Sequence, residues 1–287
     1  MPAQSTIDTI MTPAEKVQET VDYIRQHQPE GWQPQAGLVL GSGLNHISTA
    51  VQDSVVLDYA DIPHFIRTKV EGHGGKLHLG WLGGAPTVCF QGRQHLYEGP
   101  AEGIEAWTIA IRAMRALGVD IMFLTAAAGS LNKAMAPGNL MMVADHINLT
   151  GQNPLTGPND DEVGPRFPNM SRAYDPDLRS WLLDIAISDD VPLIEGVYAG
   201  VLGPNFETPA EVRMMQMFGG DAVGMSLVTE SLLANHCGMR VVACSAITNY
   251  AEGIGVSPPT HEETLAMAEQ CSGRLTQLLF GFFESLA

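Results

Sequence analysis

The chain has 287 residues, of which 45% are hydrophobic and 16% charged, and its formal net charge is −17. This excess of negative charge argues against nucleic acid and anionic membranes as partners, because both would repel the chain. The N-terminal segment lacks a basic region followed by an apolar stretch, and no run of eighteen apolar residues occurs, so we expect neither a signal peptide nor a membrane span.

Helices and strands alternate along the first half of the chain. Thr12 and Glu15 are spaced as a capping box with Pro13 at the first helical position, which predicts the start of a helix. The apolar patterns and turn residues then predict, in chain order, a strand at 36–43, a β-hairpin at 76–92, a helix at 102–118 and strands at 119–129 and 139–149.

Residues 151–176 interrupt this alternation because Pro, Gly, Asn and Asp dominate there. A loop of this length in a compact domain is usually functional or part of an interface. Beyond it we expect helices at 177–189, 210–220, 227–238 and 261–286, and strands at 195–203, 221–226 and 240–249. The helix at 210–220 would begin behind a second capping box, formed by Thr208 and Glu211 with Pro209 between them. The alternation favours one α/β domain over residues 1–287, layered around a mostly parallel sheet.

The stretch QGRQHLYEG, residues 91–99, places Arg93, His95 and Tyr97 two positions apart. On an extended strand these residues would share one face. We therefore expect a strand that presents a guanidinium, an imidazole and a phenol together. An ordinary solvated edge strand is the alternative.

Glycine-rich turns offer further candidates for binding. GSGLNH (41–46) lacks the third glycine of a dinucleotide fingerprint, so we prefer a backbone nest in which Ser42 meets an anion. His73 lies between glycines in VEGHGG and is either structural or close to a ligand. The sequence has no phosphate-binding P-loop and no nucleophile elbow, and its nine histidines show no metal-ligand spacing. The four cysteines form no C-x-x-C and favour a reducing, cytoplasmic location.

Polar residues also occur where predicted strands end. Phe206 and Glu207 precede a capped helix, so Glu207 either complements the helix dipole or accepts N–H groups of a flat ligand on which Phe206 stacks. Ser226 lies where a strand meets a helix N-terminus, a place suited to phosphate. Thr248 and Asn249 end a buried strand at the sheet edge where α/β proteins bind ligands.

Together these segments resemble the trimeric purine nucleoside phosphorylase family over about residues 36–270. The resemblance is carried by GSGL, GHGG, GRQHLYEG, DHINLTGQNPLTGPND, GPNFET, GMS and ITN. RMMQMFGGDAVGMS is most similar to the bacterial second-type inosine, guanosine and xanthosine phosphorylases. The resemblance implies an α/β fold with a twisted, mixed and partly barrel-like sheet flanked by helices. It also implies a homotrimer that needs no cofactor and, in purine salvage, converts purine nucleoside and phosphate to base and ribose 1-phosphate.

The same resemblance implies roles for individual residues. Phosphate contacts would come from Ser42, His73, Arg93, His95, Ala127 and Ser226. Ribose contacts would come from Tyr97, Met225 and His261, and base contacts from Phe206, Glu207, Val223, Gly224, Thr248 and Asn249. Phe167 would reach the pocket of the neighbouring subunit. The catalytic residues would be Asn249, Glu207, His95 and His261. One departure is Ala126, which stands where relatives usually carry Asn.

The pairing of Glu207 with Asn249 suits a 6-oxopurine. Glu207 can accept from N1–H, and Asn249 can donate to N7 or O6 as the base leaves. We therefore expect inosine and guanosine to be preferred over adenosine, and xanthosine stays open. The alternatives are a methylthioadenosine-type phosphorylase, whose relatives carry Asp in place of Asn249, a nucleoside hydrolase, a non-catalytic nucleoside-binding protein and a dinucleotide oxidoreductase.

Overall fold

The computed structural model describes residues 11–68, 74–255 and 260–287. Its strands are β1 (Ala36–Val39), β2 (Gln52–Asp58), β3 (Lys76–Leu82), β4 (Ala85–Gln91), β5 (Ile121–Ser130), β6 (Leu140–Asn148), β7 (Leu193–Gly200), β8 (Ala222–Gly224) and β9 (Arg240–Tyr250). The helices are α1 (Pro13–His27), α2 (Pro100–Leu117), α3 (Pro176–Ser188), α4 (Pro209–Met217), α5 (Val228–His236) and α6 (His261–Glu284), and there are short 3-10 helices at η1 (Asn45–Ala50) and η2 (Leu96–Glu98).

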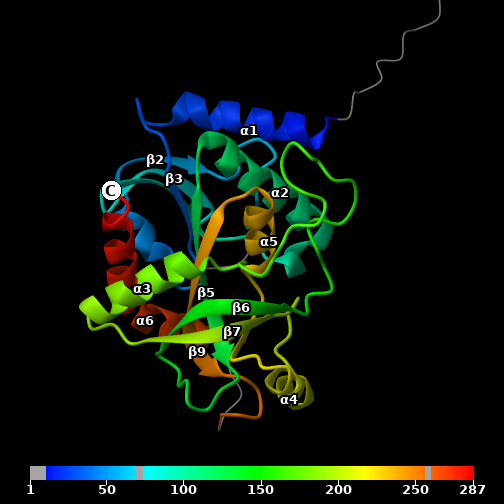
Figure 1. Ribbon diagram of the computed structural model, residues 1–287, viewed down its shortest axis with the longest axis vertical. Helices are drawn as coiled ribbons and strands as arrows, with labels where there is room; N and C mark the ends of the chain where they lie inside the picture. Colours follow the sequence, from blue (N-terminus) through cyan, green and yellow to red (C-terminus); the bar gives the residue numbers. More distant parts are fainter. Residues whose placement is uncertain (1–10, 69–73, 256–259) are drawn as a thin grey trace, which may run out of the picture.

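The strands form one mixed sheet in the order β2-β3-β4-β1-β5-β8-β7-β6-β9 (Figure 1). Strand β9 pairs with β6 and also with β5, so β5, β8, β7, β6 and β9 close into a barrel while β1 to β4 extend from it. This confirms the mixed, partly barrel-like sheet. Five of the nine described pairings, β1–β4, β1–β5, β5–β9, β6–β7 and β7–β8, are parallel, which confirms the expected parallel majority. The other four, β2–β3, β3–β4, β5–β8 and β6–β9, are antiparallel.

Helices cover both faces of the sheet, which explains why its central strands are apolar at nearly every position. Successive side chains of a strand point to opposite faces. In β5, Met122 and Leu124 join a cluster with α1, α2 and α5, whereas Ile121 and Phe123 join one with α3 and α6. Figure 1 shows α2 and α5 on one side of the strands and α3 and α6 on the other.

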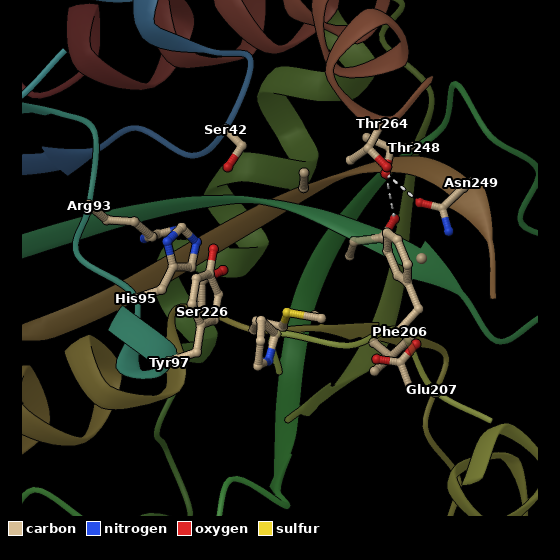
Figure 2. A pocket seen from close by; sticks show the side chains of 17 residues that line it. Ser42, Arg93, His95, Tyr97, Phe206, Glu207, Ser226, Thr248, Asn249 and Thr264 are labelled. Atoms are coloured by element: carbon tan, nitrogen blue, oxygen red, sulfur yellow. Dashed lines mark hydrogen bonds between the residues drawn. The ribbon is translucent and has the colours of Figure 1, made fainter. Parts of the chain in front are cut away.

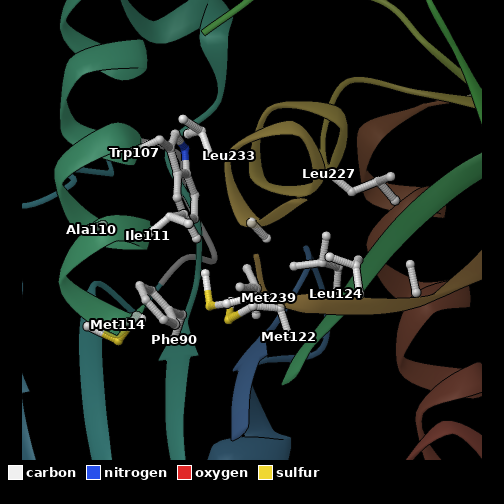
Figure 3. Close-up of a cluster of buried hydrophobic side chains, with 14 of the residues drawn as sticks. Phe90, Trp107, Ala110, Ile111, Met114, Met122, Leu124, Leu227, Leu233 and Met239 are labelled. Carbon is white, nitrogen blue, oxygen red and sulfur yellow. The ribbon is translucent and has the colours of Figure 1, made fainter. Parts of the chain in front are cut away.

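The first of these clusters lies directly behind the loop that follows β4. Trp107 of α2, Phe90 of β4 and Leu233 of α5 pack together there with several methionines (Figure 3). The Trp107 indole N–H donates to the carbonyl of Gln94 over 2.8 Å. The core therefore fixes the backbone between the two residues, Arg93 and His95, on which the site depends.

Several predictions from local sequence are confirmed. Thr12 and Thr208 both form complete capping boxes at their helices. The hairpin forms with its turn between β3 and β4, and α2 ends at Gly118, which has φ +112°. Strand β2 was not anticipated, since its sequence QDSVVLD has only two adjacent valines to indicate a strand.

The expected strand across 91–99 is wrong beyond its first residue. β4 ends at Gln91, the chain turns at Gly92 with φ +99°, and the helix η2 follows. The helix η2 is capped because the buried Glu98 carboxylate accepts from the backbone N–H of His95, its N-cap residue, over 2.6 Å. Arg93, His95 and Tyr97 therefore do not lie on one face of a strand, although they are spaced two residues apart.

The structure also bears on membrane association. Within the described ranges, no helix combines the length and apolar character that crossing a bilayer requires.

Candidate active site

A pocket of about 370 Å³ opens where β1, β4, β8 and β9 end and where β5 crosses β8. Its lining contains nearly all of the expected site residues: Ser42, Arg93, His95, Tyr97, Ala127, Phe206, Glu207, Val223, Gly224, Met225, Ser226, Thr248 and Asn249. Ala128, Gly129, Pro204 and Thr264 also line it and were not expected.

The described lining does not include three expected residues, two of which the structure leaves wholly or partly undescribed. His73 lies outside the described residues. His261 begins α6, but the structure does not describe its side chain. Phe167 lies in the long loop and is 88% exposed, which is compatible with a contact to another subunit rather than to its own pocket.

The pocket has two chemically different ends. Figure 2 shows Arg93, His95 and Ser226 gathered at one end, while Phe206 and Glu207 lie at the other. Tyr97 lies beside His95, and Asn249 lies along the wall near the second end. Donors suited to an anion and groups suited to a flat heterocycle therefore share one cavity.

Arg93 is held rigidly although it lines the pocket. Its side chain is 2% exposed, its Nε donates to Glu230 over 3.0 Å, and its Nη1 donates to the Thr125 carbonyl over 2.7 Å. A guanidinium is a planar fork of five donors, so two fixed bonds set the direction of the whole group.

His95 and Tyr97 form a stacked pair with ring centroids 4.9 Å apart. The Glu98 carboxylate lies 3.5 Å from His95 Nδ1 and binds the His95 backbone as well. Burial, together with the negative charge of Glu98, raises the pKa of Tyr97 to about 12. Tyr97 therefore stays neutral at physiological pH and can donate a hydrogen bond to a ligand.

Ser226 is positioned by Tyr198, a fully buried residue of β7. The Ser226 backbone N–H donates to the Tyr198 hydroxyl over 3.2 Å, and the two hydroxyls lie 3.4 Å apart. A Cβ at Gly224 would overlap the Tyr198 hydroxyl, so only glycine fits there. Leu227, next to Ser226, has φ +54° although it is not glycine, and its buried side chain anchors this strained turn.

Glu207 lies at the end of the pocket that suits a flat heterocycle. Burial raises its carboxyl pKa above the usual value, and the nearby Glu211 and Glu252 raise it further. A half-buried carboxylate of this kind gains most when a ligand supplies N–H donors. Phe206, which is 39% exposed, offers an adjacent ring face.

Asn249 is fixed in one orientation. The Thr248 hydroxyl donates to Asn249 Oδ1 over 2.8 Å, and Asn249 Nδ2 donates to the Tyr250 carbonyl over 3.0 Å. Since the amide carries two N–H donors, this arrangement leaves one for a ligand. Gly129 makes room for the side chain, because a Cβ there would lie 3.0 Å from Nδ2.

Sequence reasoning missed the residues that support the site from behind. Glu98, Tyr198 and Glu230 each contact an expected site residue without lining the pocket themselves. For Glu230 the only available signal was a single charged residue inside the otherwise uncharged stretch SLVTESLL. Tyr198 gave none, because a tyrosine in an apolar strand is ordinary.

Comparisons with known proteins agree with this geometry. A family model described as the phosphorylase superfamily matches residues 35–284. Purine nucleoside phosphorylase 1 of Bacillus subtilis is 44% identical, and the match covers 92% of this chain and 96% of the relative.

Crystal structures of the Schistosoma mansoni purine nucleoside phosphorylase with adenosine and with inosine both have a TM-score of 0.89, at 36% and 35% identity. Each match covers 96% of this chain and 99% of that one. The range of the family model, 35–284, contains every residue of the described pocket lining. The chain therefore belongs to the phosphorylase superfamily and, within it, to the purine nucleoside phosphorylases.

Proposed function

We propose that the protein cleaves the N-glycosidic bond of 6-oxopurine nucleosides with inorganic phosphate and releases the free base and ribose 1-phosphate. One observation carries the proposal: the anion-suited and the purine-suited ends lie in a single pocket of about 370 Å³. In phosphorolysis the phosphate oxygen must reach C1′ of the sugar while the base is still held. A shared pocket satisfies that requirement.

At the anion end, Arg93, His95, Ser42 and Ser226 would bind the phosphate. A phosphate held there can attack the sugar and can also stabilise positive charge that develops on the ribose. Arg93 offers charge-assisted hydrogen bonds from a fixed direction. The expected contributions of Ala127 and His73 to this cradle stay predictions.

At the other end, Asn249 and Glu207 would hold the base. As the glycosidic bond breaks, negative charge moves onto the purine, and the Asn249 amide can donate to N7 or O6. Glu207 can accept from N1–H, which inosine and guanosine have and adenosine lacks. A mismatched base would leave buried polar groups unpaired, and such mismatches cost about 10⁴-fold in favourable cases.

The remaining contacts complete the nucleoside site. Tyr97, Met225 and His261 would meet the ribose, while Val223, Gly224 and Thr248 would line the base. Phe206 would stack on the purine, and Phe167 would close the pocket of a neighbouring subunit in a homotrimer. The extreme exposure of Phe167 in the single chain supports that assembly.

Three broader expectations accompany the function. The single domain over residues 1–287 is supported by the continuous sheet, which includes every described strand. The cytoplasmic location is favoured by four cysteines that are free and buried. No cofactor is expected, and prolonged treatment with EDTA should leave activity intact.

A substrate panel tests the proposal. Inosine, guanosine, xanthosine and adenosine are each assayed with and without phosphate. The quantity compared is kcat/KM and not binding alone, because a related enzyme has been crystallised with adenosine. We expect cleavage only with phosphate, and inosine and guanosine to exceed adenosine by orders of magnitude. Equal kcat/KM for adenosine would contradict the proposed pairing, and cleavage without phosphate would indicate a hydrolase.

A further inference from the structure

Glu230 is a buried carboxylate that the proposed reaction does not use directly. It lies in the first turn of α5, and only 3% of its side chain is exposed. It does not belong to the described lining of the main pocket. A charge in such a place is unfavourable unless a partner compensates it, and Arg93 Nε, 3.0 Å away, is that partner.

The contact fixes the orientation of Arg93 in combination with β5. Glu230 holds the Nε edge of the guanidinium from α5, and the Thr125 carbonyl holds Nη1 from β5. Two bonds from two different elements determine both the plane of the group and its rotation. Without the carboxylate, the long arginine side chain would regain rotamer freedom that binding would have to remove.

Glu230 also lies close to the other donors at the anion end of the pocket, His95 and Ser226. A small cavity of about 10 Å³ is lined by Arg93, His95, Ser226 and Glu230, among others, and of these four only Glu230 is absent from the described lining of the main pocket. Glu230 thus stands behind the donors, on the side away from a bound anion. It can act on a phosphate only through the groups in front of it.

Electrostatics alone do not explain a carboxylate in this place. A negative charge close to a phosphate site repels the phosphate and offsets part of the attraction of Arg93. The carboxylate is therefore useful only if orienting the arginine outweighs this repulsion. The two effects have opposite signs, so they can be separated by substitution.

We propose that Glu230 is a positioning residue that holds the Arg93 guanidinium in the direction required to bind phosphate. This inference rests on the proposed function, because it takes the substrate anion to be inorganic phosphate. It assigns Glu230 no contact with substrate and no proton transfer.

Two substitutions separate orientation from charge. In Glu230→Gln the amide oxygen can still accept from Arg93 Nε, whereas the negative charge is gone. In Glu230→Ala both are lost. Asp175→Asn is the matched control, because it weakens another carboxylate–arginine pair, that with Arg240, and neither residue lines the pocket or the small cavity.

The readout is KM for phosphate and KM for inosine, with melting temperature as a check on folding. We expect Glu230→Ala to raise the phosphate KM about tenfold to a hundredfold, the factor for losing a hydrogen bond to a charged group. The phosphate KM of Glu230→Gln should stay within about fivefold of the wild-type value, since a hydrogen bond to a neutral acceptor retains roughly half the strength of one to a charged acceptor. The inosine KM should change little in both variants, and Asp175→Asn should leave both KM values unchanged.

A double-mutant cycle tests whether the effect passes through Arg93. Once Arg93→Ala has removed the guanidinium, adding Glu230→Ala should not raise the phosphate KM further, and loss of the repelling charge should lower it. Independent action would instead multiply the two single effects. Phosphate binding by calorimetry on the same variants, without nucleoside, gives the answer even if the assay detects no cleavage.

The outcomes are distinguishable from failure of the proposed function. Wild-type protein without phosphate-dependent cleavage would contradict the function, and the calorimetric cycle would still decide the role of Glu230. The inference is overturned if Glu230→Ala keeps a wild-type phosphate affinity while only its melting temperature falls. It is also overturned if Gln and Ala weaken phosphate binding equally, or if the cycle is multiplicative.

Discussion

The Asn249 carboxamide is held by Thr248 and by the Tyr250 carbonyl, while the Arg93 guanidinium is held by Glu230 and by the Thr125 carbonyl. These two fixed groups serve opposite ends of the pocket, so their removal should have different kinetic effects. We predict that Asn249→Ala lowers kcat by about 10²–10³, as loss of one transition-state donor does, with little change in phosphate KM. Arg93→Ala should mainly raise the phosphate KM. Steady-state kinetics with both substrates varied will separate the effect on kcat from the effect on the phosphate KM. An unchanged phosphate KM in Arg93→Ala would show that Arg93 does not bind phosphate.

The raised pKa of Glu207 predicts a pH dependence of nucleoside binding. Burial disfavours the charged form, so the carboxyl takes up its proton at a higher pH than an ordinary glutamate as the solution is acidified. The protonated group has lost the charge that strengthens the hydrogen bond from N1–H, so inosine affinity should fall as pH decreases through this raised pKa. Inosine binding measured by calorimetry without phosphate avoids the titration of phosphate itself. In Glu207→Gln, inosine affinity should no longer fall at acidic pH. If it still falls in this variant, the pH dependence belongs to another group.

Leu227 combines a left-handed backbone with a fully buried side chain next to Ser226. Replacing it by Ala keeps the strain and loses packing, which should cost about 2–5 kcal/mol. Replacing it by Gly loses the same packing but relieves a left-handed conformation worth roughly 1–2 kcal/mol, so Leu227→Gly should melt at a higher temperature than Leu227→Ala. Leu233, buried within α5, is the control. There the order should reverse, because Gly in a helix is about 1 kcal/mol worse than Ala, and the same order at both sites would show that Leu227 is unstrained.

At the scale of elements, α3 begins with a cap that is coupled to β9. Asp175 accepts from the backbone N–H groups of Asp177 and Leu178 and pairs with Arg240 at the start of β9. The Arg240 guanidinium is the main reason that the pKa of Asp175 is lowered to about 2. Because the folded pKa lies below the unfolded value, the pair stabilises the fold above about pH 4. That stabilisation is lost as pH falls toward 2.

We therefore predict that Asp175→Asn lowers stability at pH 7 by about 1 kcal/mol, since the pair is partly exposed and Asn still caps a helix. Asp175→Ala should cost about 1 kcal/mol more because the cap is lost too. Melting temperatures measured from pH 7 down to pH 3 should show the difference between wild type and Asp175→Asn shrinking below pH 4. A difference that is independent of pH would show that the ion pair contributes nothing.

Local sequence predicted those elements whose determinants are local. The capping boxes at Thr12 and Thr208 formed because the side chain and the third residue of the helix satisfy each other within one turn. The loop after β4 could not be predicted in this way. Its course depends on the buried Glu98 and on Trp107, which binds the Gln94 carbonyl from α2. The barrel closure by β5 and β9 also depends on contacts distant in sequence, and the family resemblance, not the alternation pattern, led to it.

For the site, the sequence indicated most residues with side chains that would touch a ligand, because such groups stand at strand ends in unusual combinations. Their supports were not visible. Tyr198 and Glu230 lie in apolar segments, and only the assembled fold shows that they face Ser226 and Arg93. Residues that contact a ligand form unusual local sequence patterns and can be predicted from them. Buried residues that orient those side chains can be identified only from the three-dimensional packing.

At the scale of the whole molecule, Phe167 tests the assembly. It is 88% exposed, with the Arg166 guanidinium 5.8 Å from its ring centroid, and it does not belong to the described lining of its own pocket. If a neighbouring subunit uses this ring, Phe167→Ala should raise the inosine KM about threefold to tenfold, the range expected for one aromatic contact, and leave the phosphate KM unchanged. Ile187→Ala, at another apolar residue that is 78% exposed, should change neither.

The same samples should be examined by light scattering for a mass of three chains. A single-chain mass together with an unaffected inosine KM in Phe167→Ala would contradict the shared pocket.

Identification of the sugar product tests the central claim most directly. Inosine and inorganic phosphate are incubated with the enzyme, the base is quantified by chromatography, and the phosphate species are followed by ³¹P NMR. The account predicts one equivalent of ribose 1-phosphate for each hypoxanthine released and no reaction when phosphate is omitted. Free ribose as the first product, or base release at the same rate without phosphate, would contradict it.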